Sequence, residues 1–391
     1  MIALEEALQI VLSSARPLDN ERVDLRESLG RILAEDVACD MDMPPFDKSL
    51  VDGYACRRAD LAGELNVIET IQAGTLPTKR IGPGQCAKIM TGAAVPAGAD
   101  YVVMIEHTEN VSVRTIRYTN RQTCDNIARR ASDVKAGQAV LVRGILIGPQ
   151  HIAALASVGC TRPLVAKRPR VAIIAGGDEL VEPAAKPGPF QIRNSNSFQL
   201  AAQLEAVGAA ARDYGMVKDV PADIDRVFKA AIRENDVVLI SGGVSVGDFD
   251  FVPSILRQNN VELLFEKIAV KPGKPTVFGV SDKGFCFGLP GNPVSTFVTF
   301  ELLVKPFLYR LMGHNYSPVY VQMCLSESVT RKETERQSWI PAEITDQTSV
   351  RPVEYKGSAD VLALCQADGL ISMDIGIASM KKGMRASVRL L

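Results

Sequence analysis

The chain has 391 residues, a hydrophobic content of 47%, a charged content of 23% and a formal net charge of −1. This length is too great for one hydrophobic core and predicts two to four domains. The balanced charge, the single Trp and the lack of a basic patch interleaved with aromatic residues exclude an extended nucleic-acid track, so any anion site must be local.

The cysteines and the hydropathy pattern bear on the compartment. The eight cysteines are scattered and form no C-x-x-C pair, which is typical of reduced thiols in a cytoplasmic protein. The first residues lack the basic segment of a signal peptide, and no apolar run approaches the length of a membrane span. We therefore expect a cytoplasmic protein that binds no membrane. The three histidines (His107, His151 and His314) lie far apart and form no zinc motif.

The first 168 residues combine helical and β patterns. Residues 1–42 open with an amphipathic helix, and residues 136–168 contain a second helix over 149–158. Between them, residues 43–135 show short strands separated by glycine and proline turns, as in a small β-domain. We expect residues 1–42 and 136–168 to form one linking domain into which the β-domain is inserted.

The rest of the chain changes character twice. After a Pro-flanked basic linker at 167–170, residues 169–312 alternate strand and helix, which predicts a doubly wound α/β domain built on a parallel sheet. From 313 to 391 short strands return and predict a C-terminal β-domain. The expected fold class is therefore multidomain α/β plus β.

Two strand-to-helix turns and one lysine loop are concentrated between 236 and 303. A buried-strand pattern over 236–240 runs into a glycine-rich turn at 241–248, and a second strand over 285–288 runs into the turn Leu289–Pro293. Asn292 suits a helix N-cap, and Pro293 suits the first helical position.

Glycine turns that precede helices bring free N–H groups to an anion, and parallel strands end at one sheet edge. The loop that carries Lys267, Lys271 and Lys274 would join them there, so we predict a pocket for a phosphorylated ligand. A single glycine-rich turn between a strand and a helix is more often only a structural turn, and the lysines alone also fit a solvated hairpin. Neither a P-loop nor a dinucleotide fingerprint occurs.

A proline-rich loop near the N-terminus carries carboxylates. Asp47 and Asp52 bracket a tight turn at Gly53. Carboxylates on a rigid loop suit Mg²⁺, which prefers oxygen ligands. Alternatively, Asp47 caps a turn and Asp52 only favours the turn conformation.

Six motifs together resemble one family. In chain order they are Pro45-Phe46-Asp47 with Val51-Asp52-Gly53-Tyr54-Ala55, Met90-Thr91-Gly92-Ala93, Gly177-Asp178-Glu179-Leu180, Ser241-Gly242-Gly243-Val244-Ser245-Val246-Gly247, Lys271-Pro272-Gly273-Lys274-Pro275 and Leu289-Pro290-Gly291-Asn292-Pro293-Val294-Ser295. Gly357-Ser358 also fits. The chain resembles the MoeA family, the molybdopterin molybdenumtransferases, which includes the E-domain of gephyrin. The match covers nearly the whole chain.

The resemblance implies a molybdopterin-binding α/β domain, an inserted small β-domain and a C-terminal β-barrel. It implies a homodimer whose active sites are shared between subunits. Adenylylated molybdopterin and molybdate would be substrates, AMP would leave, and Mg²⁺ would be the cofactor. As further partners we expect the molybdopterin adenylyltransferase and molybdoenzyme delivery proteins.

The resemblance also implies roles for individual residues. The catalytic set would be Asp52, Asp133, Lys271, Lys274 and Asp250, and the metal ligands would be Asp52, Asp219 and Asp250. The substrate-binding residues would be Thr91, Glu179, Ser241, Gly242, Gly243, Ser245, Gly247, Lys267, Pro290, Gly291, Asn292, Pro293 and Ser358.

Some positions depart from the family pattern. Gly176 stands where a Thr is common, Ala131 and Ser132 replace Gly-Glu, and Lys48 replaces an Asn. Some members carry a molybdate-contacting Arg near Pro341, for which Arg336 is a candidate substitute. These changes leave open a specialised paralogue that acts as a scaffold or on a different phosphorylated ligand.

Overall fold

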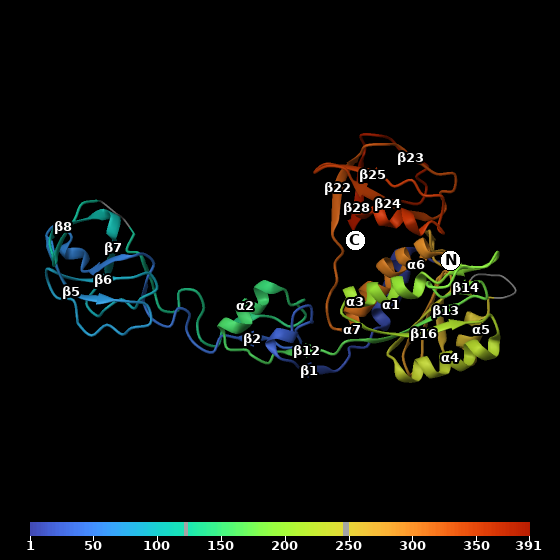
Figure 1. Cartoon of the computed structure of the whole chain (residues 1–391), viewed down its shortest axis with the longest axis horizontal. Coiled ribbons are helices and arrows are strands. Elements are labelled where there is room, and N and C mark those ends of the chain that lie inside the picture. The colour runs from blue at the N-terminus through green and yellow to red at the C-terminus, as the bar shows by residue number, and fades with distance from the viewer. Residues whose placement is uncertain (121–123, 245–249) are drawn as a thin grey trace.

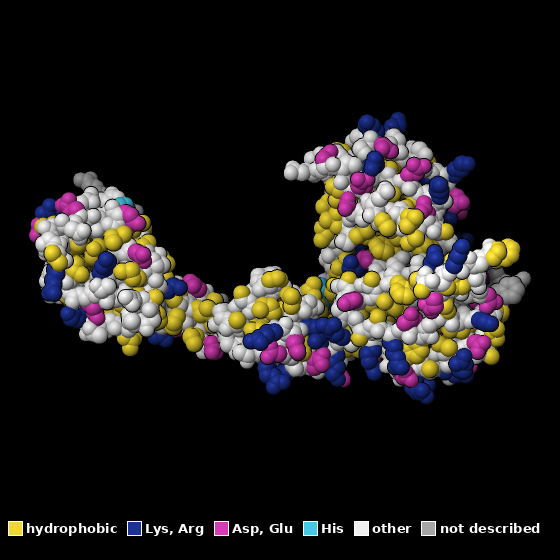
Figure 2. Space-filling model, in the orientation of Figure 1, with side chains coloured by type: hydrophobic (Ala, Val, Ile, Leu, Met, Phe, Trp, Pro, Cys, Tyr) yellow, Lys and Arg dark blue, Asp and Glu magenta, His cyan; other side chains and the backbone are white. Residues whose placement is uncertain are grey.

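The computed structural model describes residues 1–120, 124–244 and 250–391. Ser245 and Gly247, which the sequence assigns to the ligand pocket, lie outside the described residues. The molecule is elongated, with a β-domain at one end, a narrow middle section, and an α/β domain with a β-barrel at the other end (Figures 1 and 2). This arrangement confirms the multidomain α/β plus β fold class.

The α/β domain is built on a six-stranded sheet. Its strands in chain order are β13 (Arg170–Gly176), β16 (Ala210–Val217), β17 (Val237–Ser241), β18 (Glu262–Phe265), β20 (Val277–Val280) and β21 (Phe285–Leu289), and their order in the sheet is β16-β13-β17-β21-β20-β18. In the sheet, β16, β13, β17 and β21 pair with one another in parallel. β20 pairs antiparallel with β21 on one side and with β18 on the other. The prediction of a wholly parallel sheet is wrong at this edge, because the short turn before Gly284 folds β20 and β21 into a hairpin.

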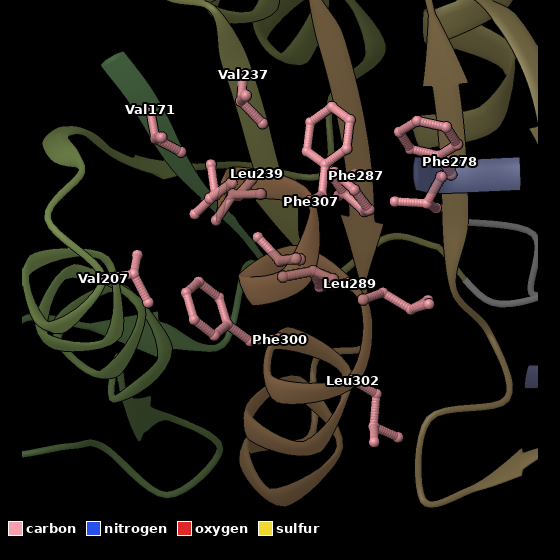
Figure 3. Packing of buried hydrophobic residues seen from close by; sticks show 14 of the residues in the cluster. Val171, Val207, Val237, Leu239, Phe278, Phe287, Leu289, Phe300, Leu302 and Phe307 are labelled. Carbon is pink, nitrogen blue, oxygen red and sulfur yellow. The ribbon is translucent and has the colours of Figure 1, made fainter. Parts of the chain in front are cut away.

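Helices cover both faces of this sheet, which explains why its central strands are apolar at nearly every position. One face packs against α1 (Leu4–Ser14), α3 (Asn196–Ala206), α6 (Pro293–Thr299), a π-helical turn (Phe300–Val304) and α7 (Lys305–Leu311). The other face packs against α4 (Pro221–Glu234) and α5 (Val252–Gln258). In the first cluster, Phe278 and Phe287 of the sheet contact Phe307 of α7 (Figure 3).

The C-terminal strands close into a barrel. They are β22 (Tyr320–Leu325), β24 (Gln337–Ile344), β25 (Ser349–Pro352), β26 (Gly369–Met373) and β28 (Arg385–Leu390). Their order is β24-β25-β22-β28-β26, and a further pairing of β24 with β26 closes the ring of five. The short strand β19 (Val270–Lys271) of the lysine loop adds to β24 and thereby joins the loop to the barrel.

The distal β-domain contains a second six-stranded sheet. Its order is β7-β4-β6-β5-β9-β8, formed by β4 (Gly53–Cys56), β5 (Glu64–Ile71), β6 (Gln85–Ile89), β7 (Tyr101–Met104), β8 (Thr108–Ser112) and β9 (Thr115–Tyr118). Gly53 is required at the start of β4, because a Cβ there would lie 1.8 Å from the Val103 carbonyl oxygen. The carboxylate of Asp52 is thereby placed at the end of this sheet.

The middle section is held by short ladders. The strand pairs are β1 (Asn20–Arg22) with β12 (Leu164–Ala166), β2 (Val37–Ala38) with β11 (Ala139–Leu141), and β3 (Lys48–Ser49) with β10 (Ile127–Ala128). The helix α2 (Pro149–Ser157) packs on this section and begins at the predicted residue. Among the described residues, no helix combines the length and apolarity needed to cross a membrane.

Candidate functional site

A cavity of about 790 Å³ lies at the carboxyl ends of β13, β17 and β21. The chain passes from β13 outward to β16 and then back to β17, so the sheet order reverses between β13 and β17. Ligands of open α/β sheets bind at this kind of reversal. Both glycine turns predicted from the sequence contribute to the lining, through Ser241, Gly242 and Gly243 on one side and Pro290, Gly291 and Pro293 on the other.

Gly242 cannot be replaced without moving the backbone. Its φ is +95°, which L-residues rarely adopt. A Cβ on this residue would lie 2.4 Å from the carbonyl oxygen of Gly176. Its N–H donates to the Leu289 carbonyl at 3.0 Å, so the glycine lets the two sheet-edge turns approach each other.

Asn196, the first residue of α3, ties the two turns together. Its side-chain Nδ2 donates to Ser241 Oγ and to the Gly291 carbonyl, each at 2.7 Å. Both Asn196 and Ser241 are buried. Asn196 is not among the site residues assigned from the sequence.

Carboxylates gather on one side of the 790 Å³ cavity. Glu179, Asp219 and Asp250 line it, and Asp178 Oδ1 accepts from the Asp219 N–H at 3.2 Å. Burial, and then the charges of Asp178, Glu179 and Asp250, raise the pKa of the Asp219 carboxyl. Within the described residues, no three His, Cys, Asp or Glu side chains form a group that could hold a metal ion.

A second cavity of about 420 Å³ adjoins the first and is lined by cations. Lys271, Lys274 and Arg336 contribute to it. The two cavities share Pro275, Pro290, Gly291 and Asn292, so they form one two-part site. The cation-lined part is suited to a small oxyanion, and the sheet-edge part is large enough for a nucleotide or pterin.

The C-terminal region contributes directly to this second cavity. Asn292 occupies the N-cap of α6 and Pro293 its first position, as predicted, but the Asn292 side chain does not cap the helix. Instead its Nδ2 donates to Ser358 Oγ at 2.8 Å, and the Ser358 carbonyl accepts from the Val294 N–H at 3.0 Å. Ser358 is thereby held at the cavity, which it lines together with Gly357 and Tyr355.

Lys267 lies apart from the other two lysines of the loop. It lines neither cavity, whereas its backbone carbonyl accepts from the Ile2 N–H at 3.1 Å. The structure therefore does not bring the Lys267 side chain to the two-part site.

Asp52 and Thr91 meet in the distal β-domain. The Thr91 N–H and hydroxyl both donate to Asp52 Oδ1 at 2.7 Å, and these bonds lower the pKa of the exposed Asp52 carboxyl. Within the described residues no hydrogen bond reaches Asp52 Oδ2. Asp133 lies in the same inserted stretch of residues 43–135. It is exposed, and its N–H donates to the Met43 carbonyl at 2.9 Å.

None of the described residues of 43–135 lines either cavity. Figure 1 shows the narrow middle section between the β-domain, in which β5 to β8 are labelled, and the α/β domain. Within one chain, the structure therefore does not bring Asp52, Thr91 and Asp133 together with Lys271, Lys274 and Asp250.

The positions that depart from the family pattern lie in different surroundings. A Cβ at Gly176 would lie 3.9 Å from Asp219 Oδ1, which is an ordinary van der Waals contact. The site therefore has room for a Cβ at this position. Ala131 has a φ of +59°, a conformation in which glycine is less strained. Pro341 lies within β24 opposite Leu370, whereas Arg336 lines the cation-lined cavity. Lys48 pairs with Ala128 in the β3–β10 ladder, and nothing there explains its choice.

Comparison with known proteins gives one consistent result. Residues 2–159 match a family model described as "MoeA N-terminal region (domain I and II)", and residues 172–310 match one described as "Probable molybdopterin binding domain". The chain is 37% identical to a molybdopterin molybdenumtransferase of Staphylococcus epidermidis and 36% identical to one of Staphylococcus aureus, over 98% of this chain and 94% of each relative.

Solved structures agree with the sequence relatives. A molybdopterin biosynthesis MoeA protein from Pyrococcus horikoshii superimposes with a TM-score of 0.87 at 30% identity, over 100% of both chains. A molybdenum cofactor biosynthesis protein from Pyrococcus furiosus shares the fold, with a TM-score of 0.64 at 21% identity. The chain belongs to the MoeA family of molybdopterin molybdenumtransferases.

Proposed function

We propose that this protein transfers molybdenum from molybdate to adenylylated molybdopterin and releases AMP. The observation that carries the proposal is the two-part site, in which a cation-lined cavity of about 420 Å³ shares four residues with a sheet-edge cavity of about 790 Å³. Molybdate suits the first part, and the adenylylated pterin suits the second. We place the reaction in the cytoplasm on the cysteine pattern of the sequence.

The proposed chemistry depends on charge stabilisation and positioning. Cleavage of the phosphoanhydride leaves negative charge on AMP and on the pterin phosphate, and preoriented donors stabilise such charge in a protein site. The backbone N–H groups of the two glycine turns would bind phosphate oxygens, and Lys271 with Lys274 would neutralise molybdate. Asn196 would keep the two turns at the spacing that the ligand requires.

We propose Mg²⁺ as the cofactor, held by Asp219 and Asp250. The carboxylates of Glu179, Asp219 and Asp250 in the lining support this, and burial together with neighbouring carboxylates raises the pKa of Asp219. Fewer than three preformed ligands suit Mg²⁺, which usually keeps several waters and binds substrate phosphates. The bound cation would neutralise phosphate charge.

We further propose that the protein is a homodimer in which Asp52 serves the partner's cavity. The separation of Asp52 from both cavities within one chain supports this, as does the absence of hydrogen bonds to Asp52 Oδ2 among the described residues. A two-fold axis would bring each β-domain arm to the other subunit's α/β domain.

The proposed function is tested by incubating purified protein with adenylylated molybdopterin and Mg²⁺, with and without molybdate, and measuring AMP by chromatography. We expect AMP release that requires molybdate. Release without molybdate would indicate a hydrolase of a phosphorylated ligand, and no release despite binding would indicate a scaffold.

A further inference from the structure

Two of the three cations in the 420 Å³ cavity are already paired with an anion of the chain itself. Glu333 Oε2 lies 2.7 Å from Arg336 Nη2 and 3.4 Å from Lys271 Nζ. Both cations line the cavity, whereas Glu333 does not. The carboxylate therefore engages these two cations from beside the cavity.

The three side chains differ in how firmly they are held. The Glu333 side chain is 61% exposed, compared with 40% for Lys271 and 22% for Arg336. The backbones of the two cations are anchored, because β19 pairs with β24 at Val270 and Gln337, beside Lys271 and Arg336 respectively. Exposed ion pairs contribute little to stability, so Glu333 can release the cations into contact with a ligand at little cost.

Glu333 is an anion under ordinary conditions. The hydrogen bond from Arg336, and then that from Lys271, hold the pKa of the Glu333 carboxyl below its usual value. An anionic ligand in the cavity would compete with the Glu333 carboxylate for the same N–H donors. It would also be repelled by the like charge, an effect that grows with the ligand's charge.

We propose that Glu333 is an internal counter-ion of the cavity, which pairs with Lys271 and Arg336 when no ligand is bound and yields them to a tetrahedral dianion. The inference rests on the proposed function, because it takes this cavity as the oxyanion site. Glu333 thereby lowers the affinity for oxyanions and eases their release.

The test is calorimetric titration of the full-length protein with molybdate, and separately with sulfate, at low ionic strength. Glu333→Gln keeps the size of the side chain and removes the charge. We expect it to tighten binding of both dianions by roughly three- to tenfold, with the gain disappearing at about 1 M salt, where charges are screened within about 3 Å.

Glu335→Gln is the matched control. Glu335 is exposed in the same loop and forms no ion pair among the described residues, so this change removes an equal charge without freeing a cation of the cavity. We expect it to leave dianion binding unchanged. If molybdate alone gives too little heat, the KM for molybdate in the AMP-release assay replaces Kd, and the same order of variants is expected.

Two results would overturn the inference. Weaker dianion binding by Glu333→Gln would mean that Glu333 orients the cations, and equal effects of the two Gln variants would mean that only net charge matters. The Lys271→Ala variant separates this from the proposed function. If it binds molybdate as well as the wild type does, the cavity is not the oxyanion site and the proposed function fails instead.

Discussion

The backbone N–H of Ile2 donates to the carbonyl of Lys267 at 3.1 Å, and the Ile2 carbonyl accepts from the Ala269 N–H at 2.7 Å. On its other side, the Ala269 carbonyl accepts from the Gln337 N–H at 2.8 Å. The first residues of the chain and the barrel strand β24 therefore hold the lysine loop between them.

From these hydrogen bonds we predict that Ile2→Pro, which removes the N–H donor, raises the KM for molybdate severalfold while AMP binding stays unchanged. The physical reason is that the loop carrying Lys271 loses one of these three backbone hydrogen bonds. The matched control is Ala3→Pro, because Ala3 has a φ of −65° and, in the described part of the chain, its N–H makes no hydrogen bond. Both variants carry the same N-terminal tag so that processing is equal. An equal KM for molybdate in the two variants would contradict this role of the Ile2 N–H.

The second prediction concerns the lysines at the oxyanion cavity. Replacing Lys271 or Lys274 with Ala should cost roughly 2–5 kcal/mol in binding of the anionic ligand. The melting temperature should change little, because the Lys271 side chain is 40% exposed and its ion pair with the exposed Glu333 spans 3.4 Å. Calorimetry and the AMP-release assay measure the two effects. The control is Lys267→Ala, which alters a lysine outside the cavity and should retain binding of the anionic ligand. A large loss of stability in Lys271→Ala with normal activity would refute the role of Lys271 in anion binding.

The third prediction concerns Asp52. Asp52→Asn keeps an oxygen that can accept from Thr91 but removes the charge, so the turn should persist while activity falls and the Mg²⁺ dependence weakens. Binding of adenylylated molybdopterin should remain, because every residue that lines the two cavities is unchanged. A titration of rate against Mg²⁺ concentration checks this. If the variant keeps the wild-type rate and Mg²⁺ requirement, Asp52 only stabilises the turn.

The fourth prediction tests the shared active site. Mixing equal amounts of an Asp52→Ala chain and a Lys271→Ala chain, with free exchange of subunits, makes about half of the dimers mixed. Each mixed dimer then has one site with both changes and one with neither, so activity should recover to about a quarter of the wild type although both parents are inactive. Different affinity tags on the two chains verify the exchange. Tagged mixed dimers that stay inactive would place the whole site within one chain.

The sequence by itself determined the local parts of this site. Buried strands that end in glycine or in Pro-Gly-Asn-Pro produce sheet-edge turns, because only residues near in sequence decide where a strand stops and a helix begins. Asn292 at the N-cap and Pro293 at the first helical position were predictable on the same grounds. So was the α/β domain, because alternating strands and helices leave few other ways to bury apolar faces.

Tertiary structure decided which distant groups meet these turns. Arg336 from the barrel loop lines the same cavity as Lys271. The Asn292 side chain donates to Ser358 instead of capping its helix, and Ile2 forms hydrogen bonds with the lysine loop. No local pattern encodes such contacts, because each depends on how the barrel and the first helix pack onto the α/β domain. Likewise, the folded middle section separates the β-domain from the α/β domain (Figure 1), and Asp52 therefore lines neither cavity of its own chain.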